Sequence, residues 1–285
     1  MRRIALPQGR LLEGPTWNAA DGELSWIDVL DQIISSGGPD GSRYCREPLA
    51  GGEPASFVLR AGGGRLIAYR HRLALIDADA MERQSIAVPA FDADRESFND
   101  AGVDSRGRLW VGTMDPGLKS PTGALYRLDP DLACHRMDDG LVMANGIAWS
   151  PDERHLYICD SGPRIVYIYD FDINHGAVEN RRIFARFDEN DGSPDGCAMD
   201  AEGHLWVAAV LAGQIIRFAP NGSIERRVAT PSLWPTSVAF GGDTLETLFI
   251  TTMRPYFGSP ATDDDGALFA VEPGVAGLPT HRFGG

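Results

Sequence analysis

Short apolar runs recur along the whole chain at a nearly constant interval. Each run begins with a leucine that follows a turn containing Gly, Asp or Arg, as in Leu109–Gly112 and Leu205–Val207. The six leucines, 42 to 49 residues apart, are Leu24, Leu66, Leu109, Leu156, Leu205 and Leu248. Glycine and aspartate in such turns supply the positive φ angles that tight hairpins need. Six copies at this interval indicate an internal repeat.

Each repeat also contains three other segments with the composition of strands. One precedes the turn, as in Ile147–Trp149, and another follows the apolar run, as in Ala124–Leu128. The remaining segment is more polar, as in Arg182–Arg186. No window of ten or more residues shows the 3.6-residue period of a helix. Four strands repeated six times predict an all-β fold, a six-bladed β-propeller of four-stranded blades. A β-sandwich with accidental spacing is the alternative.

The sixth repeat is incomplete, because few residues follow Val271 to form its outer strand. We expect Arg3–Leu6 to supply that strand, so that the two ends of the chain meet in one blade. An unpaired strand edge would otherwise be open to association with other chains. Residues 1–285 are therefore expected to form a single six-bladed domain.

The charge of the chain excludes two classes of partner. Its 285 residues include 26 Lys and Arg against 40 Asp and Glu, a formal net charge of −14 at pH 7. The phosphate neutralisation that drives nucleic-acid binding is therefore unavailable in bulk. An anionic membrane surface would repel such a chain as well. We expect no nucleic acid and no membrane as partners, and a monomer or a small homo-oligomer.

The first residues do not have the pattern of a secretory signal. Pro7 and Gly9 follow the basic start at once, so no apolar signal segment forms there. The most apolar stretch, Leu205–Ala212, has eight residues, far fewer than a bilayer span requires. The cysteines, none of them in a C-x-x-C pair, are Cys45, Cys134, Cys159 and Cys197. We expect reduced thiols and a cytoplasmic location.

Four oxygen-bearing side chains occupy the same phase of different repeats. Ten or eleven residues before the leucine, at the beginning of the innermost strand, stand Glu13, Asn99, Asn145 and Asp195. Equivalent points of different propeller blades surround the central channel at one end. Small residues follow each of the four, which would let a ligand approach the backbone closely. We expect the four side chains to point at one axis.

An oxygen-only set of this kind suits a divalent cation. No imidazole or thiolate shares the phase, so Ca²⁺, Mg²⁺ and Mn²⁺ are favoured over a thiolate zinc site. Two clustered carboxylates without a cation would repel each other and raise one pKa. The alternative interpretation is that Asp and Asn simply begin strands after turns, as they often do.

Other groups give weaker signals. The six histidines are scattered, and no G-x-S-x-G elbow of a serine hydrolase occurs. The run Asp188–Gly192 has the wrong register for an EF-hand. Asp263–Asp265 is expected to be a solvated loop, with gating of the channel as the alternative. Cys197 is expected to be a buried wall residue of the inner strand.

Several runs resemble the motifs of one known family. They are Leu12–Trp17, Phe98–Asp100, Gly107–Met114, Asn145–Asp152, Pro194–Gly196 and Asp200–Gly203. In this order they resemble the SMP-30/gluconolactonase/LRE family, also called regucalcin-like, from Leu12 to about Met253. The resemblance implies a six-bladed propeller that hydrolyses sugar lactones with one divalent cation.

The resemblance also implies roles for individual residues. Glu13, Asn145 and Asp195 match the direct metal ligands of the family. Asp195 also matches the proposed proton donor and acceptor. Asn99 matches an amide that contacts substrate or a water on the metal, and Asn145 is expected to orient substrate as well as the ion. The cation implied is one of Ca²⁺, Mn²⁺, Mg²⁺, Zn²⁺ or Fe²⁺, held by oxygen ligands.

The chain departs from the family pattern at Ser97, where many members carry an arginine two residues before the amide. Ser97 is kept as a candidate substrate-binding residue. Either the pocket has more room there, or another donor such as Arg70 or Arg254 replaces the arginine. The segment Asp115–Thr122 resembles a shortened lid over the channel mouth.

The expected function is the divalent-metal-dependent hydrolysis of a sugar lactone, a small-molecule partner, to the sugar acid. Asp195 would take a proton from water and return one to the ring oxygen as it leaves. Two alternatives stay open. One is a related propeller hydrolase that acts on phosphotriesters or other esters, and the other is a non-enzymatic calcium-binding propeller.

Overall fold

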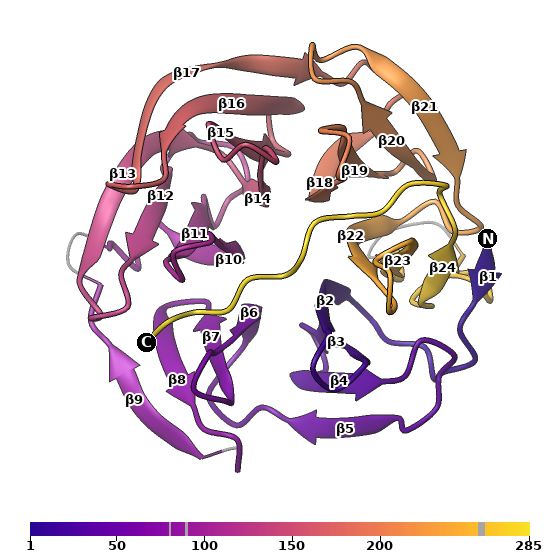
Figure 1. Cartoon of the computed structure of the whole chain (residues 1–285), viewed down its shortest axis with the longest axis horizontal. Helices are drawn as coiled ribbons and strands as arrows, with labels where there is room; N and C mark the ends of the chain where they lie inside the picture. The colour runs from indigo at the N-terminus through magenta and orange to yellow at the C-terminus, as the bar shows by residue number, and fades with distance from the viewer. Residues whose placement is uncertain (80, 89–90, 256–259) are drawn as a thin grey trace. The chain divides into compact units, whose positions relative to one another are not determined.

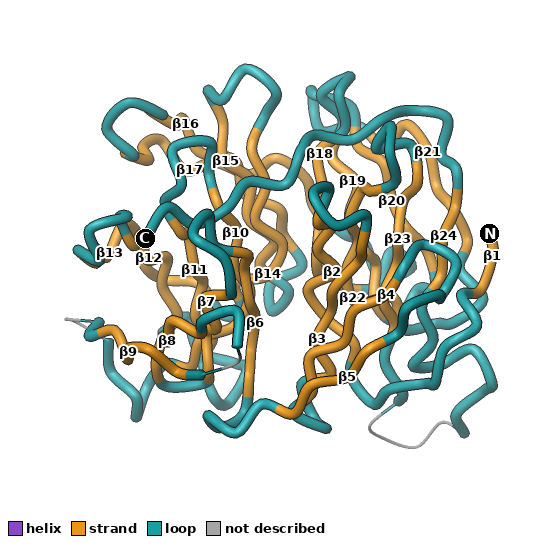
Figure 2. Tube along the Cα trace, turned by 60° about the horizontal axis from the view of Figure 1, so that its bottom comes forward, coloured by secondary structure: helices purple, strands orange, loops and turns teal. Residues whose placement is uncertain are grey.

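The computed structural model describes residues 1–79, 81–88, 91–255 and 260–285. In this described part of the chain, strands and loops make up the whole fold and no helix occurs (Figure 2). The strands form six four-stranded sheets. The prediction of an all-β six-bladed β-propeller with four-stranded blades is therefore confirmed. The described residues contain no helix with the length and apolar character to cross a membrane.

The chain divides into two compact units, and each is described by itself. Unit 1 consists of Met1–Ala50 and Ala185–Thr280. Unit 2 consists of Gly51–Phe184 and His281–Gly285. Each unit contains three of the six sheets. The single domain over residues 1–285 stays a prediction.

Unit 1 contains the following three sheets, labelled in Figure 1. The first sheet comprises β2 (Leu12–Asn18), β3 (Glu23–Asp28), β4 (Ile33–Gly37) and β5 (Cys45–Pro48). The second comprises β18 (Ser193–Met199), β19 (Leu205–Val210), β20 (Gln214–Phe218) and β21 (Ile224–Ala229). The third comprises β22 (Pro235–Gly241), β23 (Thr247–Thr252), β24 (Phe269–Val271) and β1 (Arg2–Arg3). Within this unit, β22 lies against both β2 and β18.

Unit 2 contains the other three sheets. The first comprises β6 (Pro54–Leu59), β7 (Arg65–Tyr69), β8 (Arg72–Ile76) and β9 (Glu82–Ile86). The second comprises β10 (Ser97–Val103), β11 (Leu109–Met114), β12 (Gly123–Leu128) and β13 (Cys134–Leu141). The third comprises β14 (Ala144–Trp149), β15 (His155–Asp160), β16 (Ile165–Asp172) and β17 (Ala177–Arg186), whose last two residues are counted with unit 1. Within this unit, β10 lies against both β6 and β14.

Position within the sheet explains the hydrophobic pattern of the repeat. The second strand of each sheet is covered on both faces, so it requires apolar residues at nearly every position. In β11 and β19 almost all side chains are buried. The fourth strand lies at the outer edge, and β21 exposes most of its side chains. The recurring apolar runs are therefore the second strands, and the more polar segments are the fourth.

Two hairpin turns share a buried aspartate and a tryptophan. In unit 2, Asp104 accepts hydrogen bonds from two backbone N–H groups of its own turn and from Trp110 Nε1. In unit 1, Asp200 makes the same three kinds of bond, with Trp206 as the indole donor. The sequence pattern D-x-x-G-x-L-W in both places marks this turn. It fixes the connection between the first and second strands.

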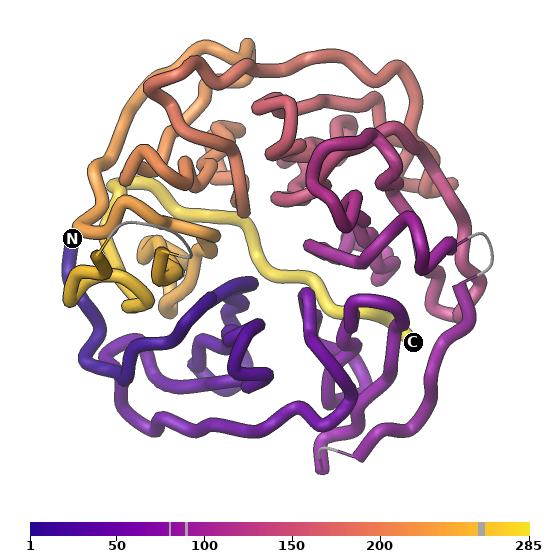
Figure 3. The backbone as a smooth tube through the Cα atoms, turned by 180° about the vertical axis from the view of Figure 1, so that it is seen from behind, coloured from indigo at the N-terminus to yellow at the C-terminus, as the bar shows by residue number. Residues whose placement is uncertain are grey.

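The N-terminal residues complete the third sheet of unit 1. β1 pairs antiparallel with β24, and the N–H of Ile4 continues the ladder with a 2.8 Å bond to the carbonyl of Leu268. Figures 1 and 3 both show the N-terminus beside β24. The predicted role of this segment is confirmed, but the predicted bounds Arg3–Leu6 are wrong. The strand ends early because the N–H of Leu6 turns back to the carbonyl of Ile4.

Deletion of residues 1–7 is expected to make the protein aggregate. The deletion exposes the edge of β24, and an unpaired edge recruits other strands. It also removes Ile4, which is buried in the core of unit 1. Light scattering and thermal unfolding would measure the effect. The double variant Arg2→Ala, Arg3→Ala keeps the backbone strand and should stay monodisperse, whereas a soluble and equally stable truncation would contradict the prediction.

Two expectations about individual residues are wrong. Asp265 is not solvated: it is 2% exposed, and its carboxylate accepts hydrogen bonds from Ser232 Oγ and from the N–H of Thr262. The bond from Ser232, 33 residues away, is a tertiary contact that no local pattern marks, and Asp263, two residues before Asp265, is exposed. Cys197 is partly exposed rather than buried, because a break in strand pairing before it disturbs the alternation of the two faces.

Candidate functional site

A break in strand pairing accompanies each of the four candidate residues. The register shifts lie between Glu13 and Thr16, Phe98 and Ala101, Asn145 and Ile147, and Pro194 and Cys197. Such irregularities re-aim side chains and are frequent beside active sites. The first strands β6 and β22, which carry none of the four residues, have similar shifts. The four residues, which share one position in the sequence repeat, therefore also share one local geometry, a register shift near the beginning of a first strand.

The glycines that follow the candidate residues are needed for this geometry. Gly14 and Gly146 have φ angles of 56° and 32°, in the left-handed region that other residues avoid. Gly196 has a different reason. A side chain at that position would collide with Ser237 of the neighbouring strand β22. The small residues thus let the strand beginnings bend and pack closely.

Unit 1 carries the two candidate carboxylates. Glu13 lies on β2 and is partly buried, and Asp195 lies on β18 with 9% of its surface exposed. Both acids stand near the beginning of a first strand, and β22 packs against both strands. Carboxylates of this kind are the anionic oxygen ligands that hard divalent cations prefer.

Unit 2 brings the two candidate amides together. Asn99 Nδ2 donates hydrogen bonds to Asn145 Oδ1 and, at 3.0 Å, to the carbonyl of Ala144. Asn145 Nδ2 donates to Ser161 Oγ at 2.8 Å. These bonds fix the orientation of the Asn145 amide, and its carbonyl oxygen has a second lone pair for a ligand.

Ser97 contacts an arginine from the adjacent sheet of unit 2. It is buried at the beginning of β10, and Arg70 Nη1 donates to its Oγ at 3.4 Å. Glu53 holds the same guanidinium, with Arg70 Nη2 donating at 2.8 Å. A cationic donor therefore lies beside Ser97 although the serine itself is neutral. Arg254, the other donor considered from the sequence, donates to Gln8 within unit 1.

The segment Asp115–Thr122 is a loop closed by its own first residue. The N–H groups of Lys119 and Ser120 donate to Asp115 Oδ2 at 2.9 and 3.0 Å. These bonds hold the pKa of the Asp115 carboxyl below its usual range. The acidic side chain is therefore used to shape the loop, whose role as a shortened lid stays a prediction.

Asp100, next to Asn99, is a titratable group that the sequence reasoning did not select. Desolvation raises the pKa of this carboxyl, and hydrogen bonds from the N–H groups of Ala101 and Gly146 oppose the shift. Ser56 Oγ lies 3.4 Å from its Oδ1. The sequence could have indicated Asp100, because this carboxylate directly follows the candidate amide Asn99 and lies in the same strand irregularity.

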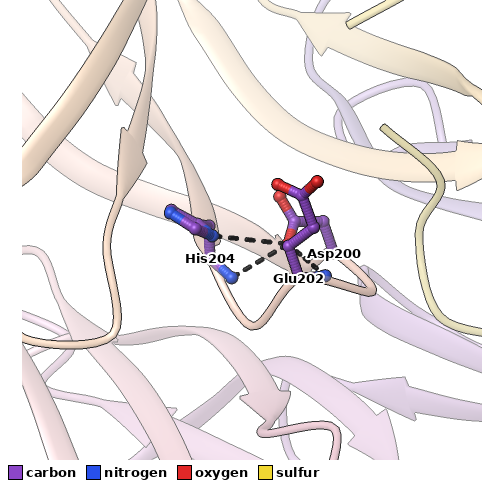
Figure 4. A group of neighbouring side chains, drawn as sticks. All are labelled: Asp200, Glu202 and His204. Atoms are coloured by element: carbon purple, nitrogen blue, oxygen red, sulfur yellow. Dashed lines mark hydrogen bonds and ion pairs between the residues drawn. The ribbon is translucent and has the colours of Figure 1, made fainter. Parts of the chain in front are cut away.

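A second group of metal-ligand side chains lies in the turn between β18 and β19. Asp200, Glu202 and His204 have one ligand atom each within 4.8 Å of one another and could hold a metal ion (Figure 4). The Arg217 guanidinium already occupies this group, with Nη2 bonded to Asp200 at 2.7 Å and to Glu202 at 2.6 Å. Asp200 also holds the turn described above. These bonds favour a structural role for the group.

The comparison with known proteins establishes the family. Residues 11–254 match the family model described as the SMP-30/gluconolactonase/LRE-like region. The chain therefore belongs to this family, and the resemblance seen in the sequence is confirmed.

Individual relatives are similar over almost their whole length. A 6-deoxy-6-sulfogluconolactonase of Pseudomonas putida is 32% identical over 96% of this chain and 94% of its own. The pentonolactonase XacC of Haloferax volcanii is 31% identical over 98% of this chain and 97% of its own. Among solved structures, a luciferin-regenerating enzyme has a TM-score of 0.90 at 27% identity, covering 99% of this chain and 98% of that chain.

Proposed function

We propose that this chain hydrolyses a sugar lactone to the sugar acid, with one divalent cation bound by Glu13, Asn145 and Asp195. The observation that carries the proposal is the nearly full-length similarity to two proteins named as lactonases, a sulfogluconolactonase and a pentonolactonase. Both names specify lactones of sugar acids, so the substrate class is proposed at that level. The expectations of a cytoplasmic location and of a monomer or small homo-oligomer stay predictions.

The chemistry of the donor set fits such a cation. Glu13 and Asp195 contribute two negative charges, and the Asn145 amide is oriented by Asn99 and Ser161. Oxygen-only sets of this composition suit Ca²⁺, Mg²⁺ or Mn²⁺. When bound, the cation would polarise the lactone carbonyl and stabilise the negative charge that develops on its oxygen.

Asp195 is the proposed acid and base of the reaction. Its carboxylate would take a proton from the water that attacks the carbonyl carbon. The same proton would then pass to the ring oxygen as the ring C–O bond breaks, which yields the open sugar acid. Asn99 would hold the substrate in line with this transfer through hydrogen bonds.

A substrate panel tests the proposal. Pentono- and hexonolactones, a phosphotriester and a simple aryl ester would each be offered to protein that has been stripped of metal and then reloaded. The proposal expects the highest kcat/KM with the sugar lactones. A preference for the phosphotriester or the aryl ester would favour the related-hydrolase alternative. Turnover of none of them, with intact cation binding, would favour a non-enzymatic calcium-binding propeller.

Ser97→Arg is expected to change KM and the ranking of sugar lactones while leaving cation affinity unchanged. The new guanidinium would compete with Arg70 for the same space and charge partner. Arg70→Gln removes the cationic donor beside Ser97, so it should also change the ranking of the sugar lactones. Arg72→Gln is the matched control, because Arg72 pairs with Glu82 instead. An unchanged ranking in both variants would place Ser97 outside the pocket, and a lost cation would place it among the ligands.

A further inference from the structure

Two buried aspartates occupy equivalent positions relative to Glu13 and Asn145. Asp28 lies 15 residues after Glu13 at the end of β3, and Asp160 lies 15 residues after Asn145 at the end of β15. Their exposed fractions are 3% and 1%. The registers also match, because the residue before each proposed ligand pairs with the aspartate.

In unit 1, the carboxylate of Asp28 binds the backbone just ahead of Glu13. The N–H of Arg10 donates to Oδ2 at 2.8 Å, and the N–H of Leu11 donates to Oδ1 at 3.2 Å. Oδ1 also lies 3.3 Å from the N–H of Asp31. Both carboxylate oxygens therefore hold residues that lie three and two positions before the proposed ligand.

In unit 2, Asp160 makes the same bonds ahead of Asn145. The N–H of Met143 donates to Oδ1 at 2.9 Å. The N–H of Val142 lies 3.2 Å from both Oδ1 and Oδ2. These residues again stand two and three positions before the proposed ligand.

The surrounding backbone bonds repeat between the two blades as well. In each blade, the carbonyl groups of the two residues held by the aspartate accept hydrogen bonds from N–H groups that lie just after the end of a second strand, one in the same blade and one in a neighbouring blade. The pairs, donor first, are Val29 and Leu11, Arg254 and Arg10, Ser161 and Met143, and Asp115 and Val142. By strand register the position of the aspartate is Thr113 in the blade of Asn99, opposite Phe98, and Ala209 in the blade of Asp195, opposite Pro194. The carboxylate is thus not a general requirement of these sheets.

We propose that Asp28 and Asp160 are positioning residues, which fix the backbone ahead of Glu13 and Asn145 and thereby set the affinity of the cation site. This inference rests on the proposed function, because it takes Glu13 and Asn145 as ligands. Bonds from a carboxylate to backbone N–H groups are charge-assisted and stronger than neutral ones. A ligand that is already held in place loses less freedom when the cation binds, so affinity rises.

The asparagine variants of the two aspartates are expected to differ. At position 28 both oxygens accept N–H groups, so one N–H must face the new NH₂ group whichever way the amide turns. At position 160 a single oxygen reaches both N–H groups, so an asparagine can retain both bonds. Asp28→Asn should therefore weaken cation binding more than Asp160→Asn. Asp160→Ala, which can make neither bond, should have the larger effect in unit 2.

The test is calorimetric titration of the metal-free full-length protein with Ca²⁺ and with Mn²⁺. Asp28→Asn and Asp160→Ala are expected to raise the dissociation constants by about 10- to 100-fold. Hydrogen exchange should accelerate in Asp28→Asn at whichever of the Arg10 and Leu11 N–H groups faces the new NH₂ group. Asp160→Ala keeps the test decisive if Asp28→Asn does not fold.

Two matched controls separate positioning from stability and from net charge. Asp104→Asn alters a carboxyl that is 1% exposed and also binds backbone N–H groups, but in the turn between β10 and β11, two strands that carry no proposed cation ligand. Asp152→Asn removes the same charge in the blade of Asn145, from a carboxyl that binds Ser150 Oγ and the N–H of Arg154 in the turn between β14 and β15. Both controls should keep the wild-type dissociation constants.

Three results would overturn the inference. Variants at positions 28 and 160 that lose thermal stability but bind both ions like the wild type would show that the aspartates only support the fold. Equal weakening in Asp152→Asn would show an effect of net charge. A wild-type protein that binds neither ion would refute the proposed cation site itself, and this failure is distinguishable because it precedes any substitution.

Discussion

Replacement of Asp195 by asparagine is expected to lower the turnover number for lactone hydrolysis by about 10²-fold or more. Asparagine has nearly the same shape and keeps an oxygen that can bind a cation, but it cannot take a proton from water. The side chain lies on β18 and is largely buried, so a change that preserves its shape leaves the surrounding packing in place. Steady-state kinetics at saturating lactone and cation measure the effect.

Thermal unfolding of the cation-loaded Asp195→Asn protein is the control for this prediction. The melting temperature should change far less than the turnover number, because the loss is one of proton transfer. Survival of turnover within a few-fold of the wild type would mean that Asp195 is only a ligand. The acid and base of the reaction would then lie elsewhere.

Glu13→Gln is expected to weaken cation binding by more than the roughly 10- to 100-fold that loss of an outer partner of a ligand costs. The substitution makes one of the two proposed anionic ligands neutral, and ligand charge is a main determinant of affinity for hard cations. Calorimetric titration gives the dissociation constant. Lactone hydrolysis should follow the same curve and return at high cation concentration.

Glu23→Gln provides the matched control for Glu13→Gln. Glu23 lies in the same sheet at the other end of the β2–β3 hairpin, and its carboxylate pairs with Arg43 at 2.9 Å. It loses the same charge in the same blade, so its cation affinity should stay at the wild-type value. Equal affinity of Glu13→Gln and the wild type would remove Glu13 from the ligand set.

The architecture was predictable because the same four-strand pattern occurs six times along the chain. The second strands need apolar residues on both faces, so their runs stand out in the chain at a regular interval. The role of the N-terminal segment followed from the incomplete last repeat. Its bounds did not, because the turn from Ile4 to Leu6 depends on a local backbone bond that no residue pattern marks.

The candidate site was predictable only in part. The phase of the repeat selected Glu13, Asn99, Asn145 and Asp195, and the structure places each at a strand irregularity. The partners of these residues depend on strand register and on neighbouring blades. Arg70 lies 27 positions from Ser97 along the chain.

The two positioning residues, Asp28 and Asp160, were also not predictable from the sequence. Asp28 and Asp160 share a 15-residue offset that becomes meaningful only when the pairing of the first and second strands is known. Asp265 was expected to be solvated but is buried, and its carboxylate binds Ser232 from another part of the same unit. Side-chain contacts of this kind are decided by tertiary structure rather than by local pattern.

The most direct test of the proposed function is the titration of metal-free protein with a divalent cation while lactone hydrolysis is recorded. The proposal predicts no hydrolysis above the uncatalysed rate before addition. The rate should then rise in proportion to added cation and level off at one equivalent per chain. Full activity in protein shown by elemental analysis to contain no metal would contradict the proposal.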